Sequence, residues 1–302
     1  MPSARANRRG MFALMGAMAF FAVNDMLIKL TAQRNPLGEV LTVRGLIAAV
    51  LIGVFVIGMG QLGALRFAFD RKVLSRTALD GAAMVLFTLA LVHMPLAEVS
   101  AINLVSPLII TALAVIFFAE EVGWRRWTAI AVGFIGTLFI VKPTPGSFNA
   151  WALLGLGCAF SAAIRDVVTR RLDPRIPTLV ISLMAAVGSA VIGAVMGLFE
   201  DWRAMSLEDA GLLAVSAACI GIGHFLIVIA FRAVDVAAIA PFRYTLLIWA
   251  CVCGYLAFGE VPDRFALLGS ALIVGSGLYA LHREVVRRRT LAAAVPPGEP
   301  GA

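Results

Sequence analysis

The chain has 302 residues, of which 61% are hydrophobic and only 14% are charged, and its mean hydropathy is +0.94. A chain of this composition cannot hide its apolar surface in one water-soluble core, so we expect an integral membrane protein. The formal net charge of +7 would suit a nucleic-acid binder, but the basic residues are distributed in a way that makes a nucleic-acid partner unnecessary.

Apolar runs of about 17 to 25 residues are long enough for an α-helix to cross about 30 Å of hydrocarbon. The sequence contains about ten such runs and therefore predicts an all-α integral membrane protein with ten transmembrane helices. Their expected limits are 11–31, 38–59, 77–93, 96–118, 126–142, 151–171, 178–198, 209–231, 235–258 and 265–282. The runs are apolar all round instead of alternating, which disfavours a β-barrel. A basic stretch before the first run resembles a signal peptide, but the run continues to Leu30 without a clear cleavage site.

The basic residues indicate an orientation in the membrane. If the N-terminus is cytoplasmic, the inner segments hold 17 of the 25 Lys and Arg residues, the outer segments hold five, and three lie inside spans. This excess follows the positive-inside rule and predicts that both termini are cytoplasmic. The sequence REVVRRRTLAAAVPPGEPGA, which starts at Arg283, is basic and then rich in Pro and Gly, and it predicts that residues 284–302 form a disordered cytoplasmic tail.

The two halves of the chain repeat. LVSPLIITALAVIFFAEEVGWR (104–125) and RYTLLIWACVCGYLAFGEVPDR (243–264) have the same length and match at five positions with an offset of 139 residues. Upstream, an offset of 141 aligns Asp25 with Asp166. We therefore expect two units of five spans, residues 10–143 and 150–283, joined by a linker that contains Pro and Gly. Because five is odd, the second unit must cross the membrane in the inverted orientation, an arrangement typical of transporters.

These motifs carry a resemblance to a known family. The helices that end in AEEV and GEVP, each followed by a Gly-containing last span, resemble the paired EamA domains of the drug/metabolite transporter superfamily. The resemblance implies a multi-pass transporter of the bacterial inner (cytoplasmic) membrane. It also identifies Glu121 and Glu260 as the family's characteristic glutamates, for which we expect a structural role at the turns between spans.

Ionisable residues inside the spans are costly unless they find a partner, a cavity or the interface. We expect Asp25 with Arg44 to help close an outer gate, and Asp166 with Arg165 or Arg243 to help close an inner one. The alternative is that these charges reach the headgroups or form permanent pairs that fix helix packing. Arg44 and Arg243 are also candidate anchors for a substrate carboxylate or phosphate.

In the superfamily the cavity is lined chiefly by the third, fourth, eighth and ninth spans. This resemblance implies the following lining candidates: His93, Asn103, His224, Phe225, Arg243, Tyr244 and Trp249. Pro107 and Pro241 interrupt the helical hydrogen bonding of the fourth and ninth spans, where either a lined bend or a packing kink would result. Tyr244 and Trp249 could stack on a planar ligand or only pack.

No motif for an enzyme is present, because the chain lacks a Walker lysine, an HExxH sequence and a serine nucleophile elbow. The four cysteines fall within spans without metal-ligand spacing, so no metal or cofactor is expected. The sequence predicts a secondary transporter that moves a small organic metabolite by alternating access, such as an amino acid, riboflavin, S-adenosylmethionine or a nucleobase. Protons are the candidate coupling ion. A membrane scaffold or receptor and a hydrophobic drug effluxer are the alternatives, and the oligomeric state is open.

Overall fold

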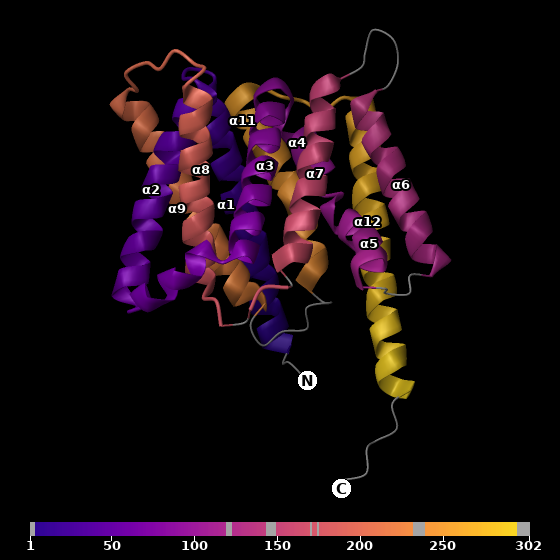
Figure 1. Cartoon of the computed structure of the whole chain (residues 1–302). Coiled ribbons are helices and arrows are strands. Elements are labelled where there is room, and N and C mark those ends of the chain that lie inside the picture. Colours follow the sequence, from indigo (N-terminus) through magenta and orange to yellow (C-terminus); the bar gives the residue numbers. More distant parts are fainter. Residues whose placement is uncertain are drawn as a thin grey trace, which may run out of the picture.

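The computed structural model describes residues 4–118, 123–142, 149–169, 171–173, 175–231 and 239–294 (Figure 1). All regular structure in these ranges is helical. Ten helical segments in the described part of the chain are long and apolar enough to cross a membrane. The predicted all-α class and the ten spans are therefore confirmed.

The first half contributes six α-helices and a short 3-10 helix. They are α1 (Ala4–Ala32), α2 (Leu37–Gly58), η1 (Leu62–Phe69), α3 (Arg71–His93), α4 (Leu96–Asn103), α5 (Ser106–Phe118) and α6 (Trp124–Val141). The second half contributes α7 (Ala150–Thr169), α8 (Thr178–Gly197), α9 (Leu207–Phe231), η2 (Ala240–Tyr244), α11 (Thr245–Phe258) and α12 (Arg264–Ala294).

Three helix limits differ from the prediction by six residues or more. The first helix starts at Ala4 instead of residue 11. The third span starts at Arg71 instead of residue 77, because the Asp70 carboxylate accepts a hydrogen bond of 2.8 Å from the Lys72 N–H and caps the helix within a basic segment that hydropathy assigns to a loop. At the other end of the chain, α12 continues to Ala294. Residues 284–294, expected to be disordered, are thus helical, and 295–302 lie outside the described residues.

Helices of one half pack mainly against helices of the other half. The pairs are α1 with α9, α2 with α8, α3 with α7, and α6 with α12, and α11 contacts both α1 and α4. Each span can be exchanged for the corresponding span of the other half, five places away. The pair α1–α9 then becomes α7–α3, and α1–α11 becomes α7 with α4 and α5, which also pack together. This is the pattern that a two-fold axis relating two inverted five-helix repeats must produce.

The fourth and ninth spans break at equivalent positions. Span four is divided into α4 and α5, with 3-10-type hydrogen bonds through Leu104 and Val105, and α5 begins at Ser106. Span nine passes through η2 before α11 begins at Thr245. Ser106 and Thr245 are 139 residues apart, which is the offset of the sequence repeat. The break therefore belongs to the repeated unit and does not depend on either proline alone.

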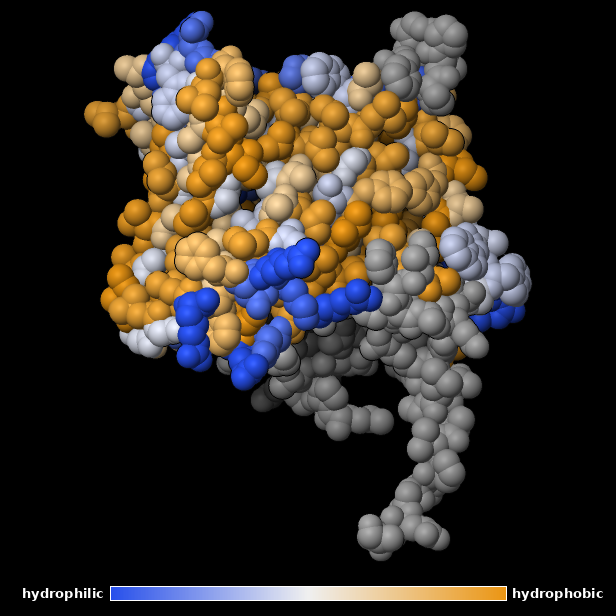
Figure 2. Space-filling model, in the orientation of Figure 1, coloured by the Kyte–Doolittle hydropathy of each residue, from blue (hydrophilic) through white to orange (hydrophobic). Residues whose placement is uncertain are grey.

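Both ends of the described chain lie on one side of the bundle. In Figure 1 the start of α1 and the end of α12 both lie at the lower end, which we call the terminal side. The opposite end, called the far side here, carries the connections from α1 to α2, from α8 to α9 and from α11 to α12. Figure 2 shows a broad apolar band across the middle of the visible face, with hydrophilic groups gathered near its lower edge.

Small residues allow close approach where α2 crosses α8. A Cβ atom added at Gly45 would lie 2.5 Å from the Ala190 backbone nitrogen, and one at Gly38 would lie 2.6 Å from the Gly197 nitrogen. Gly136 and Gly269 make a comparable contact between α6 and α12. In lipid such close backbone packing is a principal source of helix association, because apolar surface gains little by leaving hydrocarbon tails.

We predict that Gly45→Ala destabilises the protein by about 1–3 kcal/mol, the usual range for overpacking. Gly53→Ala is the matched control, since Gly53 lies on the same helix and an added Cβ would meet nothing within 4 Å. Thermal unfolding of the purified variants in detergent measures both effects. Equal melting temperatures for the two variants would contradict the packing assignment.

Candidate functional site: charges inside the bundle

Six charged side chains from four helices face one another inside the bundle. Arg165 of α7 joins two acids, through Nη1 to Asp80 Oδ1 at 2.7 Å and through Nη2 to Asp166 Oδ1 at 2.9 Å. Arg76 Nη1 lies 3.9 Å from the second oxygen of Asp80. The interior charge cluster, as we call it, consists of Asp25, Arg44, Arg76, Asp80, Arg165 and Asp166. The cluster is formally neutral, because it contains three arginines and three aspartates. Both halves of the chain contribute residues to it.

Arg44 is the least compensated member of this cluster. It is only 8% exposed, its Nε has no hydrogen-bond partner, and no described acid forms an ion pair with it. The strongest favourable charges acting on it are Asp25 and then Asp80. Asp25 accepts a hydrogen bond of 2.9 Å from the Asn24 amide, and the Ser216 hydroxyl of α9 donates to Asn24 at 2.8 Å.

The expected gate pairs are only partly present in this conformation. Asp25 and Arg44 are electrostatic neighbours without a direct ion pair. Asp166 pairs with Arg165 and not with Arg243, which is exposed and forms no ion pair with a described residue. The sequence interpretation missed Asp80, the acid that connects α3 to α7. Asp80 lies inside the expected span 77–93. An ionisable residue within a span usually needs a partner, and this would have indicated Asp80 as a candidate site residue.

Four of the predicted lining residues lie on the exposed surface. His93 stacks on Trp151 with ring centroids 3.6 Å apart, and its Nδ1 donates to the Leu89 carbonyl. His224 packs edge-on against Phe21 at 5.3 Å and donates to the Ile220 carbonyl. Phe225 is 65% exposed, and Arg243 is exposed as well.

The other three lining candidates lie deeper. Asn103, at the break of span four, has its Oδ1 3.9 Å from the thiol of Cys158, and that thiol lies in the field of Arg165, Asp25 and Asp80. Tyr244 is buried, and its hydroxyl lies so close to α12 that any Cβ at Gly277 would overlap it.

Trp249 packs between two apolar clusters that involve α1, and its indole N–H has no partner in the described residues. Asn103 and Trp249 are thus the lining candidates whose surroundings connect them to the interior charges.

Glu260 ties the two halves together on the far side. One carboxylate oxygen accepts a hydrogen bond of 2.7 Å from the Leu96 N–H at the start of α4, and the other pairs with the ammonium of Lys29, which is buried in α1. Lys29 also donates to the Met94 carbonyl at 2.6 Å. Glu260 therefore fixes helices of the opposite half as well as its own turn. Glu121, the corresponding residue of the first repeat, lies outside the described residues.

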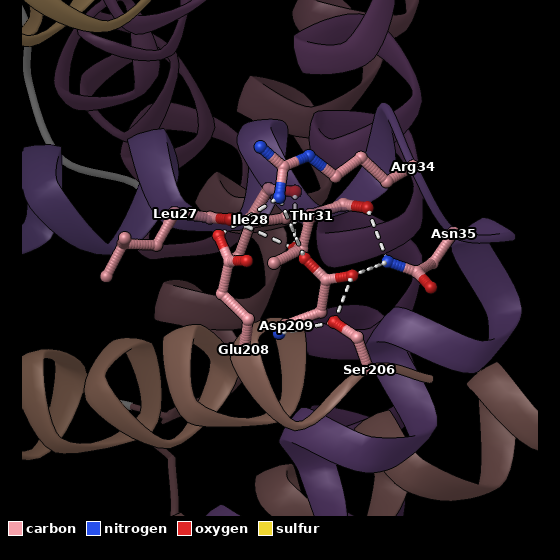
Figure 3. A network of polar contacts seen from close by, with 8 residues as sticks. All are labelled: Leu27, Ile28, Thr31, Arg34, Asn35, Ser206, Glu208 and Asp209. Carbon is pink, nitrogen blue, oxygen red and sulfur yellow. Dashed lines mark hydrogen bonds and ion pairs between the residues drawn. The ribbon is translucent and has the colours of Figure 1, made fainter. Parts of the chain in front are cut away.

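Two further ion-pair groups connect the halves on the same side. Figure 3 shows Arg34 and Asn35 after α1 facing Ser206, Glu208 and Asp209 at the start of α9. Arg34 Nη1 lies 3.2 Å from Glu208 and 3.6 Å from Asp209, and the Asn35 amide donates to Asp209 at 3.1 Å.

Lys142 after α6 pairs with Asp263 before α12. Hydrogen bonds from the Lys142 ammonium and the Ala266 N–H lower the pKa of Asp263 below its ordinary value. Such a carboxylate stabilises the fold above its unfolded pKa, and this contribution is lost on acidification. The far-side bridges are the three groups Lys29–Glu260, Arg34–Glu208/Asp209 and Lys142–Asp263.

Comparison with known proteins identifies the family to which this architecture belongs. The model of the EamA-like transporter family matches residues 8–142 and 149–281. The chain belongs to the EamA-like transporter family. This membership, together with the ten spans, identifies a multi-pass transporter of the inner membrane and not an enzyme. The family resemblance stated from the sequence is confirmed.

The names of curated relatives of this EamA-family chain state different substrates. It is 27% identical to the S-adenosylmethionine uptake transporter of Rickettsia bellii (strain RML369-C), covering 87% of this chain and 90% of that protein. It is 28% identical to the riboflavin transporter of Vibrio cholerae, with 92% and 94% covered. It is also 28% identical to the pseudopaline exporter CntI of Pseudomonas aeruginosa, with 84% and 89% covered.

One solved structure, titled only as the crystal structure of a protein, matches with a TM-score of 0.62 and 18% identity, over 93% of this chain and 98% of that one. At this identity the match supports the fold alone. The relatives named above are all transporters of small metabolites by their names.

We predict that Glu260→Gln destabilises the EamA-family protein by about 3 kcal/mol, because it leaves the buried Lys29 ammonium without its counter-charge. Glutamine still offers an oxygen to the Leu96 N–H, so the variant isolates the ion pair. Asp263→Asn is the control: its partner Lys142 is better solvated, and exposed pairs contribute about 0–1 kcal/mol. Chemical denaturation of both variants tests this, and equal losses would refute it.

Proposed function

We propose that this protein is a secondary carrier that moves a small, polar organic metabolite across the inner membrane by alternating access, with the interior charge cluster as its substrate-contacting region. The observation that carries the proposal is the cluster itself. Six ionisable side chains lie among apolar spans, and both repeats contribute to them. Charges at such depth are expensive and typically mark a transport pathway.

Inverted repeats supply the conformational change. Two halves with the same helix arrangement in opposite orientations can exchange conformations, which gives one state open to each side of the membrane. The interfaces that join the two halves, among them α1 with α9 and α3 with α7, are the ones across which the halves would move. The interior charge cluster spans the second of these interfaces through Arg165 and Asp80.

The far-side bridges act in this proposal as the closed gate of the conformation described. Each bridge connects the first half to the second, and together they join α1, α6, α9 and the turn before α12. The excess of basic residues supports a cytoplasmic terminal side, and with that orientation the closed gate faces outward. Asp25 with Arg44 stays a predicted gate pair that this conformation does not contain.

Relatives support a polar organic substrate and leave the direction to experiment. Their names include an uptake protein for S-adenosylmethionine, a riboflavin transporter and an exporter of pseudopaline. We therefore propose an amino acid derivative or a riboflavin-like solute as cargo. Protons are the proposed coupling ion, and flux measured with and without a pH gradient tests that part separately.

The proposal predicts that purified protein in liposomes exchanges at least one solute from a panel of amino acids, S-adenosylmethionine and riboflavin. Asp80→Asn should lower the exchange rate at least about tenfold, because Arg76 and Arg165 lose the acid they share and the cluster gains a net positive charge. Asp70→Asn is the control, an identical change at the exposed cap of the same helix. Flux of hydrophobic dyes alone would instead support a drug effluxer.

A gate test uses Cys158 as a native reporter, since it is 4% exposed and lies beside Asn103. With the other three cysteines replaced by alanine, Arg34→Gln combined with Asp209→Asn should increase labelling of Cys158 several-fold by an impermeant thiol reagent added from the far side. Arg175→Gln, which breaks a local pair with Asp173 on the other side, is the control. Equal labelling in both variants would exclude the far-side bridges as a gate.

A further inference from the structure

The interior charge cluster leaves specific hydrogen-bonding capacity unused. Arg44 is more than nine-tenths buried, yet its Nε has no partner and no described acid pairs with it. A guanidinium in this state retains several N–H donors with the planar geometry that matches a carboxylate. Snorkelling to headgroups does not account for it, because the side chain is enclosed by protein.

The acids around Arg44 are unequally engaged. Asp80 accepts a hydrogen bond of 2.7 Å from Arg165 and lies 3.9 Å from Arg76, so it has two cationic partners. Asp25 accepts one hydrogen bond, from Asn24, and forms no ion pair with a described cation. One cation and one anion on neighbouring helices, Arg44 on α2 and Asp25 on α1, thus remain without a direct ionic partner.

Charge balance selects the kind of ligand. The cluster is formally neutral, so a ligand with a single net charge would leave an uncompensated charge among apolar spans, which is unfavourable. A ligand that carries one carboxylate and one ammonium keeps the cluster neutral and satisfies both free partners. Resting on the transport function proposed above, we propose that Arg44 and Asp25 form the binding site for the head group of an α-amino acid or its derivative, with Arg44 taking the carboxylate and Asp25 the ammonium.

Trp249 provides an independent indication that a polar ligand enters this region. Its indole N–H is buried without a partner in the described residues. The ring packs in the apolar cluster that includes Ala22 and Met26 of α1 and Val43 of α2, which flank Asp25 and Arg44 in the sequence. A buried indole usually finds a hydrogen-bond acceptor, and a bound solute would supply one.

The test measures binding to the full-length protein in nanodiscs by calorimetry, with the twenty common L-amino acids and S-adenosylmethionine as probes. The tightest binder is then compared with two analogues that keep its side chain, an amine without the carboxylate and an acid without the ammonium. Each analogue should bind at least about tenfold more weakly than the parent, because one buried charge is left unpaired.

Two variants make the assignment residue-specific. Arg44→Lys should weaken binding of the parent and of the acid analogue about tenfold or more and leave the amine analogue unchanged, since lysine cannot make the paired contacts. Asp25→Asn should give the reverse pattern and weaken the parent and the amine analogue. Arg126→Lys, at a buried arginine of α6 outside the cluster, is the control and should change none of the three affinities.

Three outcomes overturn the inference: no zwitterionic probe binds, the analogues bind as tightly as the parent, or both variants weaken all three compounds equally. The last result would indicate a merely structural role. If liposomes carry riboflavin while every amino acid fails to bind, the amino-acid head site is wrong and the transport function stands. If no solute is carried but the crossed pattern of binding appears, the site is supported and the transport proposal fails.

Discussion

Packing between the two inverted halves is the constraint on which the rest of this structure depends. Within the described residues, the most strongly packed helix pairs all join one half to the other, so the core forms between the repeats. In a bilayer the helices cannot rely on the exclusion of apolar surface from water and depend instead on close contact. Glycines at the crossings of α2 with α8 and of α6 with α12 supply that contact, and they bring charges from different repeats within reach of each other.

Polar residues in this protein divide into two groups with different physical roles. Lys29 and Glu260 satisfy each other and also bind backbone groups at the start of α4, so their cost of burial is offset by a nearly complete set of partners. The cluster around Arg44 is satisfied less fully. A charge can be removed from water at tolerable cost when all its hydrogen-bond and ion-pair partners are present. Charged groups with missing partners are expected where another molecule must bind and leave.

The sequence could predict the spans because hydropathy depends on composition over about twenty residues. It could predict the inverted orientation of the second repeat because each repeat has an odd number of spans, five. It could not predict partners that depend on three-dimensional placement. Glu260 looked like a residue that fixes its own turn, but its partners lie 231 and 164 residues away. Asp80 was overlooked, although an ionisable residue inside an expected span is costly unless it has a partner. The pairing with Arg165 becomes visible only once α3 packs on α7.

The helix pairs obey the internal two-fold relation, whereas the charges do not. The offset of 141 aligns Asp25 with Asp166, yet Asp166 pairs with an arginine beside it and Asp25 accepts an amide hydrogen bond. A perfectly symmetric chain would have inward-open and outward-open states of equal energy. In the proposed mechanism, side chains that break the symmetry, such as the far-side bridges, would set the difference in energy between those states. Under the proposed alternating-access mechanism that difference must be small. Two of the three bridges are partly exposed ion pairs that solvent can replace at little cost, which agrees with the proposal.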